Sequence, residues 1–349
     1  MLKIFFLRRL HFLEWGKRKQ CEFEIKNEVR EICMLFDGHS DILYALERWR
    51  RGGERDVFRR WYLQSFQRGQ VEGGIFVLWG NPEEERTLQE QILQQLQTVQ
   101  AEVEAAQGAL QPIYGREDLL ELAERTETAD GVSFLLGIEG LDGCVQDIGA
   151  IEWLYAQGVR HLSLTWNGGN AFAAGINAVG GLTALGRLAV RRVQEMGMLL
   201  DVSHLNDLSL RDVLWETRGP LVASHSNSRS LCDAPRNVTD AQAKAIAATG
   251  GLIGINSHPP FIAQDKGKQD LQHLSDHVAY LADLVGVTHV AFGFDLNYWE
   301  ENGTEWHILK NYAQTEYFLQ LLERRGFSKQ EIAQLARENF LRVLGQVLT

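Results

Sequence analysis

Short apolar runs alternate with stretches of helical periodicity from Met34 to the end of the chain. The runs are rich in leucine, β-branched and aromatic residues, which predicts buried strands. They lie at residues 34–38, 73–79, 133–138, 161–165, 198–203, 221–224, 252–257 and 289–294. Eight strands that alternate with helices predict an α/β fold of the (β/α)8 TIM-barrel type, whose functional residues gather at the C-terminal ends of the strands.

The segments between the runs carry apolar side chains on one helical face. In the clearest example, Leu88, Ile92, Leu96, Val99 and Val103 recur every three or four residues, so we expect a helix with one buried stripe there. Further helices are expected at 148–157, 183–196, 239–248, 271–285, 309–325 and 329–347. The last two are extra C-terminal helices of one barrel domain, residues 34–349.

Residues 1–33 differ from the rest in charge. They hold eight Lys and Arg against five Glu, a net charge of +3, whereas the remainder holds 27 against 41, a net charge of −14. Arg8, Arg9 and His11 interrupt the apolar opening, which is then too short for a signal sequence or a membrane span. We therefore expect residues 1–33 to be an N-terminal extension outside the native fold, with Met34 as the natural start.

The overall composition is typical of a soluble globular protein, with 45% hydrophobic and 23% charged residues. The net charge of −11 argues against nucleic-acid binding, and no stable membrane association is expected. Cys21, Cys33, Cys144 and Cys232 are scattered without CxxC spacing. This pattern favours a reducing, cytoplasmic location over a disulfide framework or a thiolate zinc site.

Metal-binding side chains follow four of the predicted strands. His39 and Asp41 are two residues apart, so they point to the same side of the first strand's end. Later runs close on Glu139, His204 and His225. Any one of these residues is more often an ordinary loop residue than a ligand, but five at the ends of several strands favour a metal centre. Three imidazoles and two carboxylates suit zinc.

Six short segments occur in order along the chain. They are 37–41 (DGHSD), 137–140 (GIEG), 201–204 (DVSH), 224–226 (SHS), 236–240 (RNVTD) and 293–295 (GFD). Together they resemble the membrane (renal) dipeptidases, zinc peptidases of the amidohydrolase-like barrel group. The tail 338–343 (ENFLRV) also resembles the closing helix of that family, so the resemblance covers nearly all of the chain after Met34.

The resemblance implies a cofactor of two Zn²⁺ per chain. His39 and Asp41 would bind one ion, His204 and His225 the other, and Glu139 would bridge the two. Two divalent cations about 3.5–4 Å apart repel each other, and a carboxylate has two oxygens with which to offset that repulsion. The ligand types leave other divalent metals, such as manganese or cobalt, open.

The resemblance also implies roles for residues around the metals. A hydroxide that bridges the ions would be the nucleophile, and Asp295 would move the proton to the leaving amine. Arg236 would hold the free C-terminal carboxylate of a dipeptide. Related enzymes carry a substrate-binding histidine after the fourth strand, but this chain has Trp166 followed by Asn167. Trp166 offers only an indole N–H donor, so substrate binding is expected to use Trp166 and Asn167.

The resemblance therefore implies a binuclear zinc dipeptidase that hydrolyses dipeptides with a free C-terminal carboxylate, including L-Xaa-D-Xaa, and that forms a homodimer. One alternative is another metal-dependent amidohydrolase, such as an amidase, deaminase or lactonase; the His39-x-Asp41 pair and Arg236 argue against it. A second is a non-catalytic binding protein, against which the complete ligand set argues. Trp299 and Trp306 are interpreted as packing residues, with a lid over the pocket as the alternative.

Overall fold

The computed structural model describes residues 33–125, 131–296 and 308–349. Apart from Cys33, the expected N-terminal extension lies outside the described residues, and so do Trp299 and Trp306. In the described part of the chain, no helix is both long enough and apolar enough to cross a lipid bilayer.

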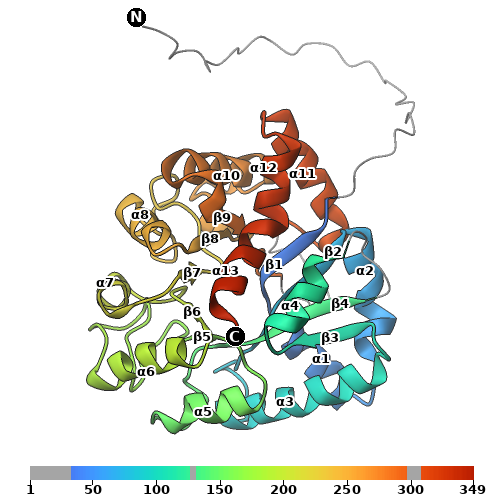
Figure 1. The fold of residues 1–349 in the computed structure, drawn as a ribbon, viewed down its shortest axis with the longest axis vertical. Coiled ribbons are helices and arrows are strands. Elements are labelled where there is room, and N and C mark those ends of the chain that lie inside the picture. Colours follow the sequence, from blue (N-terminus) through green and yellow to red (C-terminus); the bar gives the residue numbers. More distant parts are fainter. Residues whose placement is uncertain (1–32, 126–130, 297–307) are drawn as a thin grey trace, which may run out of the picture. The chain divides into compact units, whose positions relative to one another are not determined.

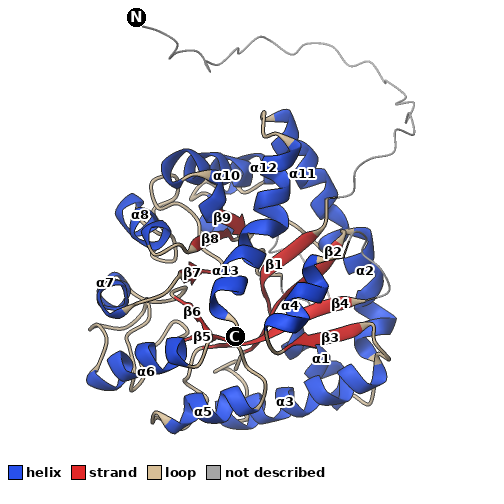
Figure 2. Cartoon of the chain, in the orientation of Figure 1, coloured by secondary structure: helices blue, strands red, loops and turns tan. Residues whose placement is uncertain are grey.

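Parallel strands form one sheet that curves into a nearly closed barrel (Figures 1 and 2). The strands are β1 (Leu35–Ser40), β2 (Val71–Leu78), β3 (Leu110–Ile113), β4 (Val132–Glu139), β5 (His161–Ser163), β6 (Leu199–Asp201), β7 (Leu221–Ala223), β8 (Leu252–Ile255) and β9 (Val290–Phe292). Their order around the sheet is β1-β2-β4-β5-β6-β7-β8-β9. A bridge between Ser40 and Leu296 brings the two ends of the sheet together. The predicted barrel is confirmed.

The eight predicted strands are all present, but the sequence missed β3. This strand pairs with the first half of β4, where Leu110 lies opposite Val132, whereas β5 pairs with the last residues of β4. β3 is only four residues long and contains Pro112, which cannot donate to a sheet hydrogen bond and weakens the strand signal.

Helices cover the outer side of the sheet and one end of the barrel (Figure 2). They are α1 (Ile42–Arg51), α2 (Leu63–Arg68), α3 (Leu88–Ala105), α4 (Arg116–Ala123), α5 (Gly149–Ala156), α6 (Ala184–Glu195), α7 (Asp207–Glu216), α8 (Asp240–Ala248), α9 (Pro259–Ile262), α10 (Leu271–Val285), α11 (Thr315–Arg324), α12 (Lys329–Ala333) and α13 (Asn339–Val347). The Thr87 and Glu90 side chains cap the start of α3. The helix predicted at 329–347 is α12 and α13 joined by one π-helical turn, Gln334–Glu338.

The core has two layers because strand side chains alternate between the faces of the sheet. In β2, Ile75 and Val77 belong to a cluster inside the barrel, whereas Phe76 belongs to the larger cluster under the helices. Phe340 of α13 joins the inner cluster, and α13 lies over one end of the barrel (Figure 1). A Cβ atom at Gly38 would collide with the Phe340 ring, so this close approach requires glycine. The opposite end is left for polar groups.

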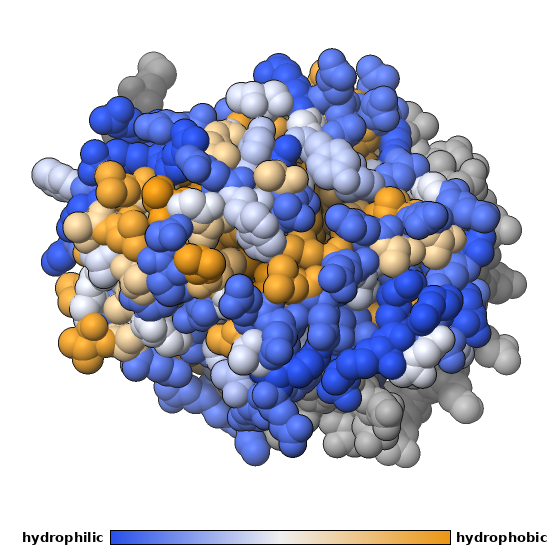
Figure 3. Space-filling view, turned by 90° about the horizontal axis from the view of Figure 1, so that it is seen from below, coloured by the Kyte–Doolittle hydropathy of each residue, from blue (hydrophilic) through white to orange (hydrophobic). Residues whose placement is uncertain are grey.

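A buried ion pair joins the base of the barrel to the C-terminal helices. Glu72 of β2 is fully buried and pairs with Arg337, whose Nη2 also donates to Leu122 O at 2.8 Å. Burial raises the pKa of Glu72, while the charge of Arg337 opposes that rise. The side chains of this pair are largely inside the protein, 0% exposed for Glu72 and 15% for Arg337. At the surface, on the face drawn in Figure 3, apolar side chains lie in a band between hydrophilic regions.

We expect Arg337→Met to lower the free energy of unfolding by about 3–5 kcal/mol, because it leaves the Glu72 carboxylate buried without its cation. Urea denaturation measures the change. The matched control is Arg192→Met, which breaks an ion pair with Glu152 whose side chains are 39% and 52% exposed; it should cost less than about 1 kcal/mol. Equal losses in the two variants would contradict the prediction.

Candidate metal centre

The five expected ligands meet at the C-terminal end of the barrel. His39 belongs to β1 and Asp41 follows it, Glu139 is the last residue of β4, and His204 and His225 follow β6 and β7. All five are buried, with at most 7% of their surface exposed. Because parallel strands end at the same rim, residues up to 186 positions apart in the chain become neighbours.

One oxygen of Glu139 faces three imidazoles. Glu139 Oε1 lies 3.4 Å from His39 Nε2, 2.9 Å from His204 Nε2 and 3.2 Å from His225 Nε2. His39 Nε2 is also 3.7 Å from Asp41 Oδ1. The side chains therefore form two groups able to hold a metal ion, His39–Asp41–Glu139 and Glu139–His204–His225, which share the carboxylate.

The donor atoms fit cations. His204 Nδ1 donates to Asn167 Oδ1 at 2.8 Å, so the His204 Nε2 lone pair points at His225 Nε2, 3.0 Å away, and at Glu139. Lone pairs this close repel one another unless a cation or a proton lies between them. In addition, the buried His39 Nε2 and Asp41 Oδ1 atoms have no hydrogen-bond partner among the described residues. These residues could therefore hold metal ions.

Burial sets the protonation of the centre. It keeps the pKa of His204 and His225 well below the usual range, helped by the positive charge of Arg236, and a metal ligand must be a neutral imidazole. Burial also raises the pKa of Asp41 and Glu139 to about 7. A divalent cation favours the ionised form of both carboxyls, so metal binding and loss of their protons are coupled.

Asp295 faces this centre from the end of β9. Its Oδ1 lies 3.9 Å from His39 Nε2, and its Oδ2 accepts a hydrogen bond from Asn256 Nδ2 at 3.0 Å. Burial raises the pKa of Asp295 to about 7. Asp295 and His204 also have left-handed backbones, with φ of 59° and 67°. Non-glycine residues adopt this conformation at a cost, and such strain is concentrated at functional sites.

Arg236 lies in the same interior and is only 5% exposed. Its Nη2 donates to His225 O at 3.2 Å, and its guanidinium lies 5.6 Å from the centre of the Phe261 ring. Arg236 Nε is buried and has no hydrogen-bond partner among the described residues. The side chain thus offers an unused donor beside the metal centre.

Trp166 and Asn167 follow β5 at the same rim. The Trp166 ring is half-buried, with its centroid 5.5 Å from that of Trp79 and 6.2 Å from that of His204. Trp166 therefore forms an aromatic wall beside one half of the centre. Asn167 accepts the hydrogen bond from His204 Nδ1, a contact that the sequence did not predict. The contact of Asn167 with substrate stays a prediction.

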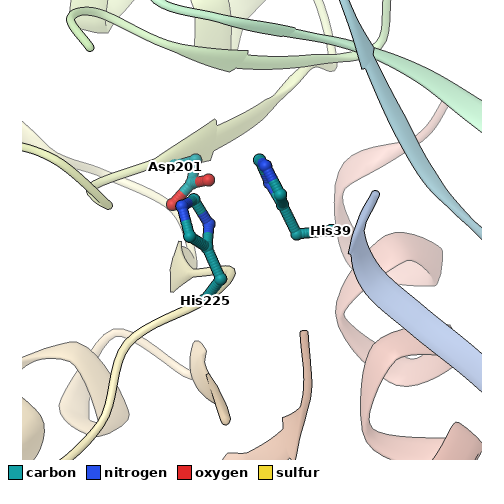
Figure 4. A group of neighbouring side chains, drawn as sticks. All are labelled: His39, Asp201 and His225. Carbon is teal, nitrogen blue, oxygen red and sulfur yellow. The ribbon is translucent and has the colours of Figure 1, made fainter. Parts of the chain in front are cut away.

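Sequence reasoning missed Asp201, Ser224 and Asn256. Asp201 lies beside His39 and His225 and forms a third metal-type group with them (Figure 4). Burial alone would raise the pKa of Asp201. Hydrogen bonds from His161 and Ser224 more than offset burial, and the pKa of Asp201 lies well below the ordinary value. The sequence held a signal for a functional role of Asp201, because Asp201 is the charged residue within the apolar run 198–203.

The sequence of this chain matches a family of known peptidases. A family model described as "Membrane dipeptidase (Peptidase family M19)" matches residues 24–349. The chain is 34% identical over 228 residues to an uncharacterized protein in the pqqA 5′ region of Klebsiella pneumoniae, an alignment that covers 62% of this chain and 81% of that protein. It is 31% identical over 221 residues to the dipeptidase aclJ of Aspergillus oryzae, with 62% of this chain and 52% of that protein covered.

A solved structure shares the fold. The crystal structure of a metallo peptidase from Rhodobacter sphaeroides, liganded with a phosphinate mimic of the dipeptide L-Ala-D-Ala, superposes with a TM-score of 0.79 at 22% identity. The match covers 90% of this chain and 99% of that one. Since the family model spans nearly the whole sequence, the resemblance is confirmed, and the chain belongs to the membrane dipeptidase family, peptidase family M19, a family of metal-dependent hydrolases.

Proposed function

We propose that this chain is a binuclear zinc dipeptidase that hydrolyses dipeptides with a free C-terminal carboxylate. The observation that carries the proposal is the position of Glu139 Oε1 within 3.4 Å of three imidazole nitrogens, which suits a carboxylate shared by two cations. In this proposal His39 and Asp41 hold one ion, and His204 and His225 hold the other. When bound, the metal pair supplies an acidified water and polarises the peptide carbonyl.

Asp295 is the proposed proton carrier. Asn256 holds Asp295 Oδ2, which leaves Oδ1 directed at the centre, 3.9 Å from His39 Nε2. From there Oδ1 can accept the proton of the attacking water and then deliver it to the leaving amine. A carboxyl that is fixed by a hydrogen bond at one oxygen keeps the other oxygen available for both transfers.

Arg236 is the proposed reader of the substrate carboxylate. Its buried guanidinium has an unsatisfied Nε donor, and a carboxylate accepts paired hydrogen bonds from such a fork. Trp166 would line the pocket beside the metals, and Asn167 would contact the substrate in addition to holding His204. Because the Rhodobacter sphaeroides structure holds a mimic of L-Ala-D-Ala, D-residues at the second position belong to the proposed substrate range.

The test is hydrolysis by zinc-reconstituted protein. We expect cleavage of L-Ala-L-Ala and L-Ala-D-Ala, no cleavage of the same dipeptides with an amidated C-terminus, and loss of activity in His204→Ala. Metal analysis should find two zinc ions per chain. Protein that holds two zinc ions but cleaves neither free dipeptide would refute the proposal. A homodimer and a cytoplasmic location remain predictions, and sedimentation and fractionation measure them.

We further expect Arg236→Lys to lower kcat/KM for free dipeptides by about 10- to 150-fold, mainly through KM. This is the loss of a charge-assisted hydrogen bond of about 1.5–3 kcal/mol, because lysine cannot form the paired contact. Steady-state kinetics measures it. The control is Arg211→Lys, whose side chain is 70% exposed and lies on α7. An unchanged KM in Arg236→Lys would assign carboxylate recognition to another residue.

A further inference from the structure

Four hydrogen-bond donors surround the carboxylate of Asp201. Asp201 Oδ1 accepts from Ser203 N at 2.8 Å and from Ser224 N at 3.0 Å. Oδ2 accepts from Ser224 Oγ at 2.5 Å and pairs with His161 Nε2 at 3.0 Å. All of these residues are buried, with at most 1% of their surface exposed. A carboxylate has about four acceptor positions, so Asp201 has no oxygen lone pair left for a metal ion.

Ser224 connects this carboxylate to the metal centre. Ser224 Oγ lies 2.7 Å from His225 Nδ1, on the side of the imidazole opposite Glu139. The same hydroxyl lies 3.5 Å from His39 Nδ1, at the outer limit of a hydrogen bond. The rings of His39 and His225 are in contact, with centroids 3.7 Å apart and planes tilted by 32°, so the position of one constrains the other. Figure 4 shows the two rings with Asp201 beside them.

The direction of these hydrogen bonds is determined by chemistry. An ionised carboxylate only accepts, so the Ser224 hydroxyl must donate its proton to Asp201 Oδ2. The lone pairs of Ser224 Oγ then accept from His225 Nδ1–H. With its proton on Nδ1, His225 has a lone pair on Nε2, where it faces Glu139 and His204. That tautomer is the one that can bind a metal ion at Nε2.

We propose that Asp201 and Ser224 form a positioning relay that sets the tautomer of His225 and, through the contact between the two rings, the orientation of His39. One carboxylate outside the metal pair thereby prepares a ligand in each half of the centre. Proximity to His39 and His225 alone would make Asp201 a metal ligand. In the relay, Asp201 instead orients ligands without binding metal. The relay rests on the proposed function in one respect, that His39 and His225 bind metal.

The test compares zinc affinities of Ser224→Ala, Asp201→Asn and the double variant, measured by competition with a chromophoric chelator. Removal of a group that orients a ligand lowers metal affinity by about 10- to 100-fold. We expect both single variants to keep two binding sites with affinity lowered in this range. The zinc affinity of the double variant should be no lower than that of the weaker-binding single variant, because both changes break the same relay. The visible spectrum of the Co²⁺-substituted protein should change in both single variants.

Ser275→Ala is the matched control. Ser275 is fully buried on α10 and donates to Gln272 O, so its loss should lower stability without changing zinc affinity. Wild-type zinc affinity in Ser224→Ala would overturn the relay. Loss of one zinc ion in Asp201→Asn, but not in Ser224→Ala, would overturn it in favour of a direct ligand. Wild-type protein that binds no zinc would instead overturn the proposed function, and with it the basis of the relay.

Discussion

Exchange of Glu139 for glutamine is expected to cost the protein one of the two proposed metal ions and more than about a hundredfold in kcat/KM. The loss should exceed the 10- to 100-fold range of groups outside the ligand set. Glutamine keeps the shape of the side chain, but its neutral amide cannot offset the repulsion between two cations. Three imidazole nitrogens within 3.4 Å of Glu139 Oε1 would then share no anion. Metal analysis and dipeptide kinetics measure the two effects.

The control for Glu139→Gln is another buried carboxylate outside the centre. Glu102 of α3 is fully buried, accepts from Phe58 N at 2.9 Å and pairs with Arg50 at 2.5 Å. Glu102→Gln should lower stability and leave metal content unchanged. If Glu139→Gln retains two metal ions and wild-type kinetics, the bridging role is wrong.

Asp295→Asn should lower kcat by about 10²- to 10⁴-fold, the usual contribution of a positioned general acid or base. The asparagine keeps the side-chain shape but cannot accept and return a proton at the atom that faces the centre. We expect metal content to stay at the wild-type level and KM to change little, since the carboxylate of the substrate is assigned to Arg236. Steady-state kinetics on L-Ala-L-Ala, together with metal analysis of the same sample, measures this separation.

Asp207→Asn serves as the control for a general loss of carboxylate charge. Asp207 lies at the start of α7, with a 58% exposed side chain that pairs with Arg229 at 2.8 Å. Its kinetics should match those of the wild type. Should Asp295→Asn lose metal in proportion to activity, Asp295 would be a ligand rather than a proton carrier.

Much of the barrel was predictable because its strands are buried on both faces. Such strands form continuous apolar runs, and runs of this kind matched β2 and β4 closely. Strand β3 was missed because Leu110 and Ile113 are its buried residues and Pro112 stands between them. Its place on β4 depends on a pairing between segments separated along the chain, which local sequence does not encode.

The candidate site was predictable only in part. His39 and Asp41 are close in sequence, so their common direction followed from strand geometry. The outer contacts were not predictable: Asn167 holds His204, and Ser224 links Asp201 to His225. An asparagine in a loop and a serine after a strand are ordinary in sequence. Their roles depend on which atoms the closed barrel brings within hydrogen-bond distance.

By itself, the sequence determined the alternation of strands and helices, the family, and the residue types of the candidate metal centre, because periodicity and ligand chemistry are local properties. Only the tertiary structure decided that one oxygen of Glu139 lies within 3.4 Å of three imidazole nitrogens. It also decided that the two oxygens of Asp201 accept from four hydrogen-bond donors. The physical reason is closure of the sheet. Distances of 3 Å between side chains on different strands are set by register and packing around the whole barrel, to which every strand contributes.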